Sequence, residues 1–105
     1  MGMGFAYQGA SGDLYNFLLV NMANPKALPW HGGLFAFAKY TPDPLFFGEG
    51  DNLFKAMTTC PEWQKAEELQ DITVAYLMLE EDPRKRAAAL ADLLANHDAP
   101  LNRAG

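Results

Sequence analysis

Acidic side chains form the densest groups of potentially reactive residues in this sequence. Glu49 and Asp51 flank Gly50, and the run Glu80-Glu81-Asp82 follows later in the chain. Carboxylates that meet in space could bind a divalent cation. Asp and Gly are also ordinary turn residues, and acidic residues are favourable near the beginning of a helix. We therefore interpret the first group as a turn and the second as a solvated element end.

The histidines and the single cysteine are the other side chains able to bind a metal or act as a nucleophile. His31 precedes two glycines, and His97 lies near the predicted end of a helix. One pair of histidines without nearby cysteines falls short of a zinc-binding pattern, and Cys60 has no adjacent histidine to activate its thiol. We predict no metal and no cofactor. One cysteine also excludes an internal disulfide, which allows a reducing, cytoplasmic location.

The charge balance bears on the partners that the chain could bind. Eight Lys and Arg residues against 13 Asp and Glu residues give a formal net charge of −5. Lys and Arg drive binding to nucleic-acid phosphates, and the only basic cluster is Arg84-Lys85-Arg86, which we interpret as a solvated helix face. Trp30 and Trp63 lack interleaved basic residues, so we expect core or edge packing. No apolar run approaches the roughly 20 residues that cross a bilayer, so no membrane partner is expected.

The first half of the chain is predicted to form strands. Four apolar segments pair as two hairpins, 5–8 with 14–20 and 34–40 with 45–47. The first hairpin is indicated by the turn-rich segment 9–13. Pro25 and Pro29 mark an irregular connection, and the prolines of 41–44 favour a loop inside the second hairpin.

The second half of the chain is predicted to be mainly helical. The expected elements are a short helix at 52–57, a helix at 61–69, a strand at 72–79 and a helix at 83–96. Thr59 is expected to cap the second of these, with Pro61 near its first turn. Asp82 is expected to cap the last, with Pro83 at its first position. Half of the residues are hydrophobic, and a chain of 105 residues is long enough to bury one hydrophobic core. Residues 1–105 are therefore predicted to form a single domain.

Short motifs in the middle and at the end of the chain indicate a family. Gly33-Leu34-Phe35 is followed by Phe46-Phe47-Gly48 and then by a turn and a helix, and residues 90–102 read LADLLANHDAPLN. These motifs, with the segment 63–79 between them, resemble the signature strands and the closing run of GIY-YIG endonucleases. The resemblance implies an α+β fold in which residues 33–102 form a central antiparallel sheet of about three strands flanked by helices. Residues 1–32 would add an N-terminal hairpin and a connection.

The resemblance also implies where the catalytic side chains would stand. The family's two tyrosines, its phosphate-binding arginine and its metal-binding glutamate correspond here to Phe35, Phe46, Ala56 and Leu90. Phe has no hydroxyl with which to position water or pass a proton, and Ala and Leu can neither clamp a phosphate nor bind a metal. Gly48, Asn52 and Asn102 are supporting positions by the same resemblance. We expect the four replaced positions to converge on one side of the sheet, forming an apolar surface filled by the chain itself or by a partner.

These replacements predict a catalytically inactive GIY-YIG-like domain that acts through protein interaction or as a regulatory or structural component. One alternative is a nucleic-acid binder that keeps the family's groove without its chemistry. A second alternative is a divergent metal-dependent nuclease that uses displaced residues such as Tyr40, Tyr76 or His97. The sequence does not identify the protein partner.

Overall fold

The computed structural model describes residues 4–20, 25–38, 44–61, 64, 74–97 and 99 of the chain. Its elements in chain order are β1 (Gly4–Gln8), β2 (Leu14–Val20), the 3-10 helix η1 (Pro25–Ala27), β3 (Gly33–Ala38), β4 (Pro44–Gly50), α1 (Leu53–Thr58), β5 (Val74–Leu79) and α3 (Pro83–Asn96). No helix of the described residues is long and apolar enough to span a membrane. The described elements, an antiparallel set of strands with separate helices, are those of an α+β fold, as predicted.

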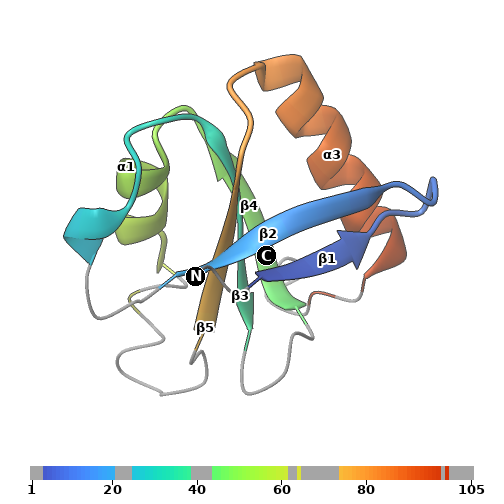
Figure 1. Cartoon of the computed structure of the whole chain (residues 1–105), viewed down its shortest axis with the longest axis horizontal. Helices are drawn as coiled ribbons and strands as arrows, with labels where there is room; N and C mark the ends of the chain where they lie inside the picture. The colour runs from blue at the N-terminus through green and yellow to red at the C-terminus, as the bar shows by residue number, and fades with distance from the viewer. Residues whose placement is uncertain are drawn as a thin grey trace.

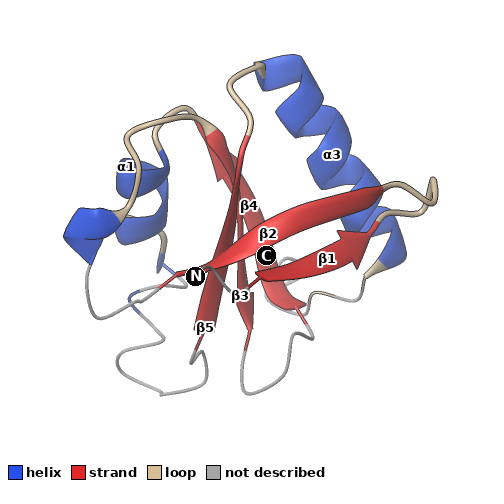
Figure 2. Cartoon of the chain, viewed as in Figure 1, coloured by secondary structure: helices blue, strands red, loops and turns tan. Residues whose placement is uncertain are grey.

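All five strands belong to one open antiparallel sheet, in the order β1-β2-β5-β3-β4 (Figures 1 and 2). Phe35 of β3 pairs with Gly48 of β4 on one side and with Leu77 of β5 on the other. The predicted pairing of the 34–37 and 45–47 segments, with the 72–79 segment beside them, is confirmed. β1 pairs with β2, and β2 pairs with β5, so the sheet continues through five strands rather than ending after about three.

The two faces of the sheet are covered by different helices. Successive residues of a strand point to opposite faces. In β3, Leu34 and Ala36 belong to the core cluster that includes Leu93 of α3, whereas Phe35 and Phe37 belong to the cluster that includes Met57 of α1. Figure 1 shows α1 and α3 on opposite sides of the strands. The domain therefore has two separate hydrophobic cores with the sheet between them.

Local capping explains where the helices begin. The Asn52 side chain accepts a hydrogen bond from the Lys55 N–H at 3.2 Å, and the Asp82 side chain accepts one from the Arg84 N–H at 2.9 Å. The predicted helix at 83–96 and the cap at Asp82 are confirmed. Thr59 closes α1, because its N–H and its hydroxyl both donate to the Lys55 carbonyl. The predicted helix at 61–69 lies mostly outside the described residues.

Arg86 is a buried cation, which corrects the prediction of a solvated basic helix face. The residue is only 3% exposed, while Arg84 and Lys85 are exposed as expected. At 100° per residue, one of three consecutive helix positions can point inward while its neighbours face water. The Arg86 guanidinium donates from Nη1 to the carbonyls of Glu80 and Glu81, each at 3.1 Å, and forms ion pairs with Glu49 and Asp51. Arg86 thereby joins α3 to the end of β4.

A second polar contact joins the other end of α3 to the β1–β2 turn. Asp92 accepts hydrogen bonds from the Ser11 N–H at 2.8 Å, the Ser11 hydroxyl at 2.6 Å and the Tyr15 hydroxyl at 2.7 Å. These donors hold the pKa of Asp92 below its ordinary value. The Asp92 carboxylate in turn raises the pKa of Tyr15 from 10.0 to about 12. The turn itself contains Gly12 at φ 96°, a conformation that favours glycine.

Candidate functional site

Three of the four positions implied by the family resemblance meet on the α1 side of the sheet. The rings of Phe35 and Phe46 lie 6.0 Å apart, and both contact Phe37. Ala56 and Phe46 pack against the buried cluster that contains Phe35. Phe35 is only 3% exposed, so the space around these three positions is filled by the chain's own side chains.

Leu90 does not join these residues, which corrects the expectation that all four positions converge. It packs on the opposite face of the sheet, against the cluster that contains Leu93 and Phe47. The sheet therefore separates Leu90 from Phe35. The sequence predicts a helix at 83–96 that contains Leu90, but it does not specify which face of the sheet that helix covers.

The supporting positions have structural roles in the described residues. A side chain at Gly48 would collide with the Phe35 ring, so glycine lets that ring lie over the β4 backbone. Asn52 caps α1. Asn102 lies outside the described residues, as does Tyr40.

Tyr76 and His97, two of the displaced residues considered for catalysis, lie in an aromatic cluster on the α3 side. The Tyr7 ring lies 6.1 Å from Tyr76 and 5.6 Å from His97. His97 Nε2 is 2.7 Å from the Gln8 carbonyl oxygen. Within the part of the chain that the structure describes, no three His, Cys, Asp or Glu side chains form a group that could hold a metal ion.

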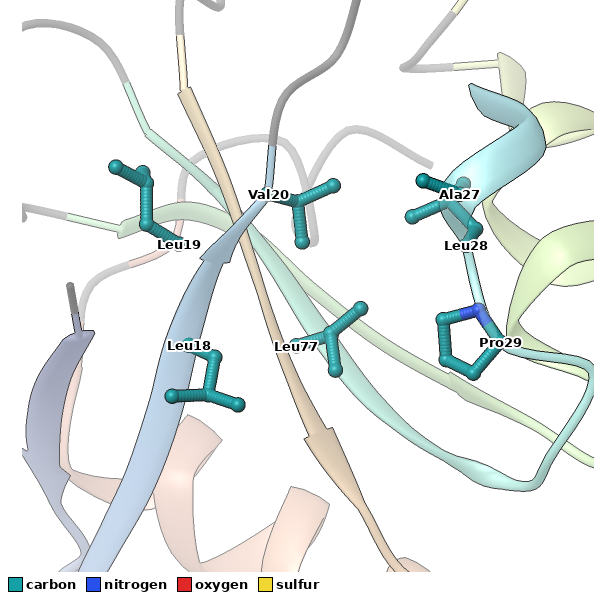
Figure 3. A pocket seen from close by; sticks show the side chains of 7 residues that line it. All are labelled: Leu18, Leu19, Val20, Ala27, Leu28, Pro29 and Leu77. Carbon is teal, nitrogen blue, oxygen red and sulfur yellow. The ribbon is translucent and has the colours of Figure 1, made fainter. Parts of the chain in front are cut away.

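An apolar groove on the α1 side of β2 and β5 is the most distinctive surface feature. It has a volume of about 290 Å³ and is lined by Leu18, Leu19, Val20, Ala27, Leu28, Pro29 and Leu77. Figure 3 shows Val20 and Leu77 on one side of the groove and Leu28 and Pro29 on the other. Its volume is at the lower end for ligand pockets, and no lining side chain is polar. The groove is suited to a few aliphatic side chains rather than to a polar cofactor.

The wall of the groove opposite the sheet is held in place by α1. Leu28 is buried in the core, and the Pro29 carbonyl accepts a hydrogen bond from the Phe54 N–H at 3.0 Å. The His31 carbonyl accepts one from the Leu53 N–H at 2.9 Å. These carbonyls pair with donors of the first helical turn, which have no partner within the helix. The 28–31 segment therefore forms a fixed wall of the groove.

Exposed apolar side chains extend the groove into a larger surface. Leu18 is 56% exposed, Leu79 is 55% exposed and Leu14 is 64% exposed. All three lie on the same face of the sheet, because Leu18 pairs with Leu77 and the positions alternate along both strands. We call Leu14, Leu18, Leu77 and Leu79 together with the groove the β2–β5 face.

Trp30 lies at the edge of the fixed wall and is 64% exposed. Its ring stacks on Phe54 at 5.2 Å with an interplanar angle of 16°. Trp30 is therefore not a core residue, and its stacking on Phe54 agrees with the predicted packing at an edge. Trp63 lies outside the described residues. An exposed Trp held by a stacked neighbour is the kind of side chain that often dominates a protein interface.

The elements around the β2–β5 face differ in charge from the chain as a whole. The chain has a net charge of −5. No carboxylate occurs in the described residues of β2, η1, β3, α1 or β5, and the cations of these elements are Lys26 and Lys55. Both lysines are exposed, and no ion pair to either is present among the described residues. Carboxylates do border the face: Glu81 Oε1 lies 3.3 Å from His31 Nδ1 at the end of the fixed wall, and Glu80 directly follows Leu79.

One signal in the sequence could have identified this surface. The strand Leu14–Val20 reads LYNFLLV and carries large apolar residues on both of its faces. A strand with one solvated face normally alternates apolar and polar residues, whereas a strand covered on both faces is apolar throughout. Apart from Asn16, which lies between Leu14 and Leu18 on the groove side, β2 has the apolar composition of a strand covered on both sides. Among the described residues, α3 and α1 leave its groove side open.

Comparisons with protein-family models, with curated proteins and with solved structures found no match to this chain.

Proposed function

We propose that this chain is a non-catalytic binding domain whose β2–β5 face docks onto a protein partner. The observation that carries the proposal is the exposure of Leu14, Leu18 and Leu79 together on one face of the sheet, beside the apolar groove. Burial of one leucine side chain stabilises a complex by about 1.5 to 3 kcal/mol. Three such residues beside a preformed groove supply the apolar centre of an interface.

Absence of catalysis is part of the same proposal. The positions that correspond by resemblance to a tyrosine pair and an arginine are occupied by Phe35, Phe46 and Ala56. The rings of Phe35 and Phe46 pack between β3, β4 and α1 and supply neither a hydroxyl nor a cation there. In this proposal the chain acts in the cytoplasm, where the buried thiol of Cys60 stays reduced.

The relationship to GIY-YIG endonucleases is also proposed rather than established. The antiparallel order β4-β3-β5 supports it, because the resemblance implies a central sheet built from these segments. The position of Leu90 on the α3 side does not support a retained arrangement of the four site positions. The binding proposal depends on the exposed face and is independent of this relationship.

Nucleic-acid binding is a second candidate because of one feature. Trp30 is exposed, and Lys26 and Lys55 on the neighbouring elements are exposed with no ion pair among the described residues. Exposed aromatic rings beside cations can stack on bases. The groove itself is lined only by apolar side chains, which favours a protein segment. The affinity of the chain for labelled single-stranded DNA and RNA, measured at two salt concentrations, tests this alternative.

The proposed function is tested by comparing the chain with two variants. Proteins captured from the source cells are identified, and each candidate is purified and titrated against the wild-type chain, Leu18→Asp and Leu94→Asp. Leu94 is an exposed leucine of α3, away from the groove, and provides the matched control. We expect one purified partner to bind the wild type and Leu94→Asp equally and to bind Leu18→Asp at least tenfold more weakly, which corresponds to about 1.4 kcal/mol.

Equal binding of the partner to all three proteins would show that the β2–β5 face is not the interface. Binding of oligonucleotides that weakens steeply with salt, without any protein partner, would favour the nucleic-acid alternative. Circular dichroism of the three purified proteins confirms that Leu18→Asp is folded.

A further inference from the structure

We draw no further inference here: the strongest candidate, the apolar groove beside the exposed leucines of the β2–β5 face, belongs to the surface already described, and nothing in the structure shows what covers it, because lysines and carboxylates both border it.

Discussion

Replacement of Arg86 by methionine is expected to destabilise the domain by about 3 kcal/mol. The two hydrogen bonds from Nη1 to the Glu80 and Glu81 carbonyls are charge-assisted, and each contributes about 1.5 kcal/mol or more. The ion pair with Asp51 adds little, because the Asp51 side chain is 91% exposed and can be rehydrated. Methionine occupies much of the volume of the arginine stem, so the cavity contribution is small.

The assay is unfolding by heat and by urea, followed by circular dichroism. For a domain of about 100 residues, 3 kcal/mol corresponds to a fall in Tm of about 12 to 24 °C. Arg84→Met is the matched control, since Arg84 is the exposed neighbour two residues earlier, and its Tm should stay close to that of the wild type. Arg86→Lys should give an intermediate value, because a lysine lacks the planar fork that reaches several acceptors. If Arg86→Met were as stable as Arg84→Met, the guanidinium would not be joining α3 to β4.

Three further predictions follow from the packing. The hydrogen bond from Tyr15 to Asp92 should stabilise the fold fully below pH 10 and be lost as the pH rises toward about 12, the pKa of Tyr15. The urea stability of the wild type should therefore fall toward that of Tyr15→Phe across this range, and a constant difference between the two proteins would contradict the assignment. Leu18→Asp should change the free energy of unfolding by less than about 0.5 kcal/mol, whereas Leu34→Asp, at a fully buried position, should cost several kcal/mol or prevent folding. Equal losses of stability in the two variants would show that Leu18 is covered within the isolated chain. Neither the wild type nor Leu90→Glu should cleave DNA with magnesium or manganese, and cleavage that co-purifies with the protein would refute the non-catalytic proposal. Leu90→Glu should also lower the Tm, because it puts a charge against apolar neighbours.

Local patterns in the sequence were sufficient to predict most elements. Asp82 followed by Pro83 and an alanine-rich segment predicted α3 to its boundaries. The turn-rich 9–13 segment separated β1 from β2 as predicted, because turn residues act on the backbone within a few positions. The loop predicted at 41–44 lies outside the described residues except for Pro44, which begins β4. The role of Thr59 in closing α1 was not predicted, because a threonine can close one helix as readily as it begins another.

Tertiary features could not be predicted from the same patterns. Arg86 is buried because acceptors from Glu49, Asp51 and the 80–81 backbone surround it, and no local pattern relates these segments. Leu90 faces the α3-side core because the helix carrying it covers the face opposite α1. The role of the exposed leucines could have been suspected from β2, whose two faces are both apolar. Which face remains open depends on where the helices pack.

The most direct test of the central claim is an NMR titration of the domain, labelled at its leucine methyl groups, with the purified partner. The account predicts that the methyl signals of Leu18, Leu77 and Leu79 shift as the complex forms, while those of Leu34 and Leu93 on the opposite face do not. Shifts confined to Leu34 and Leu93, or binding that leaves the Leu18, Leu77 and Leu79 signals unchanged, would contradict docking on the β2–β5 face.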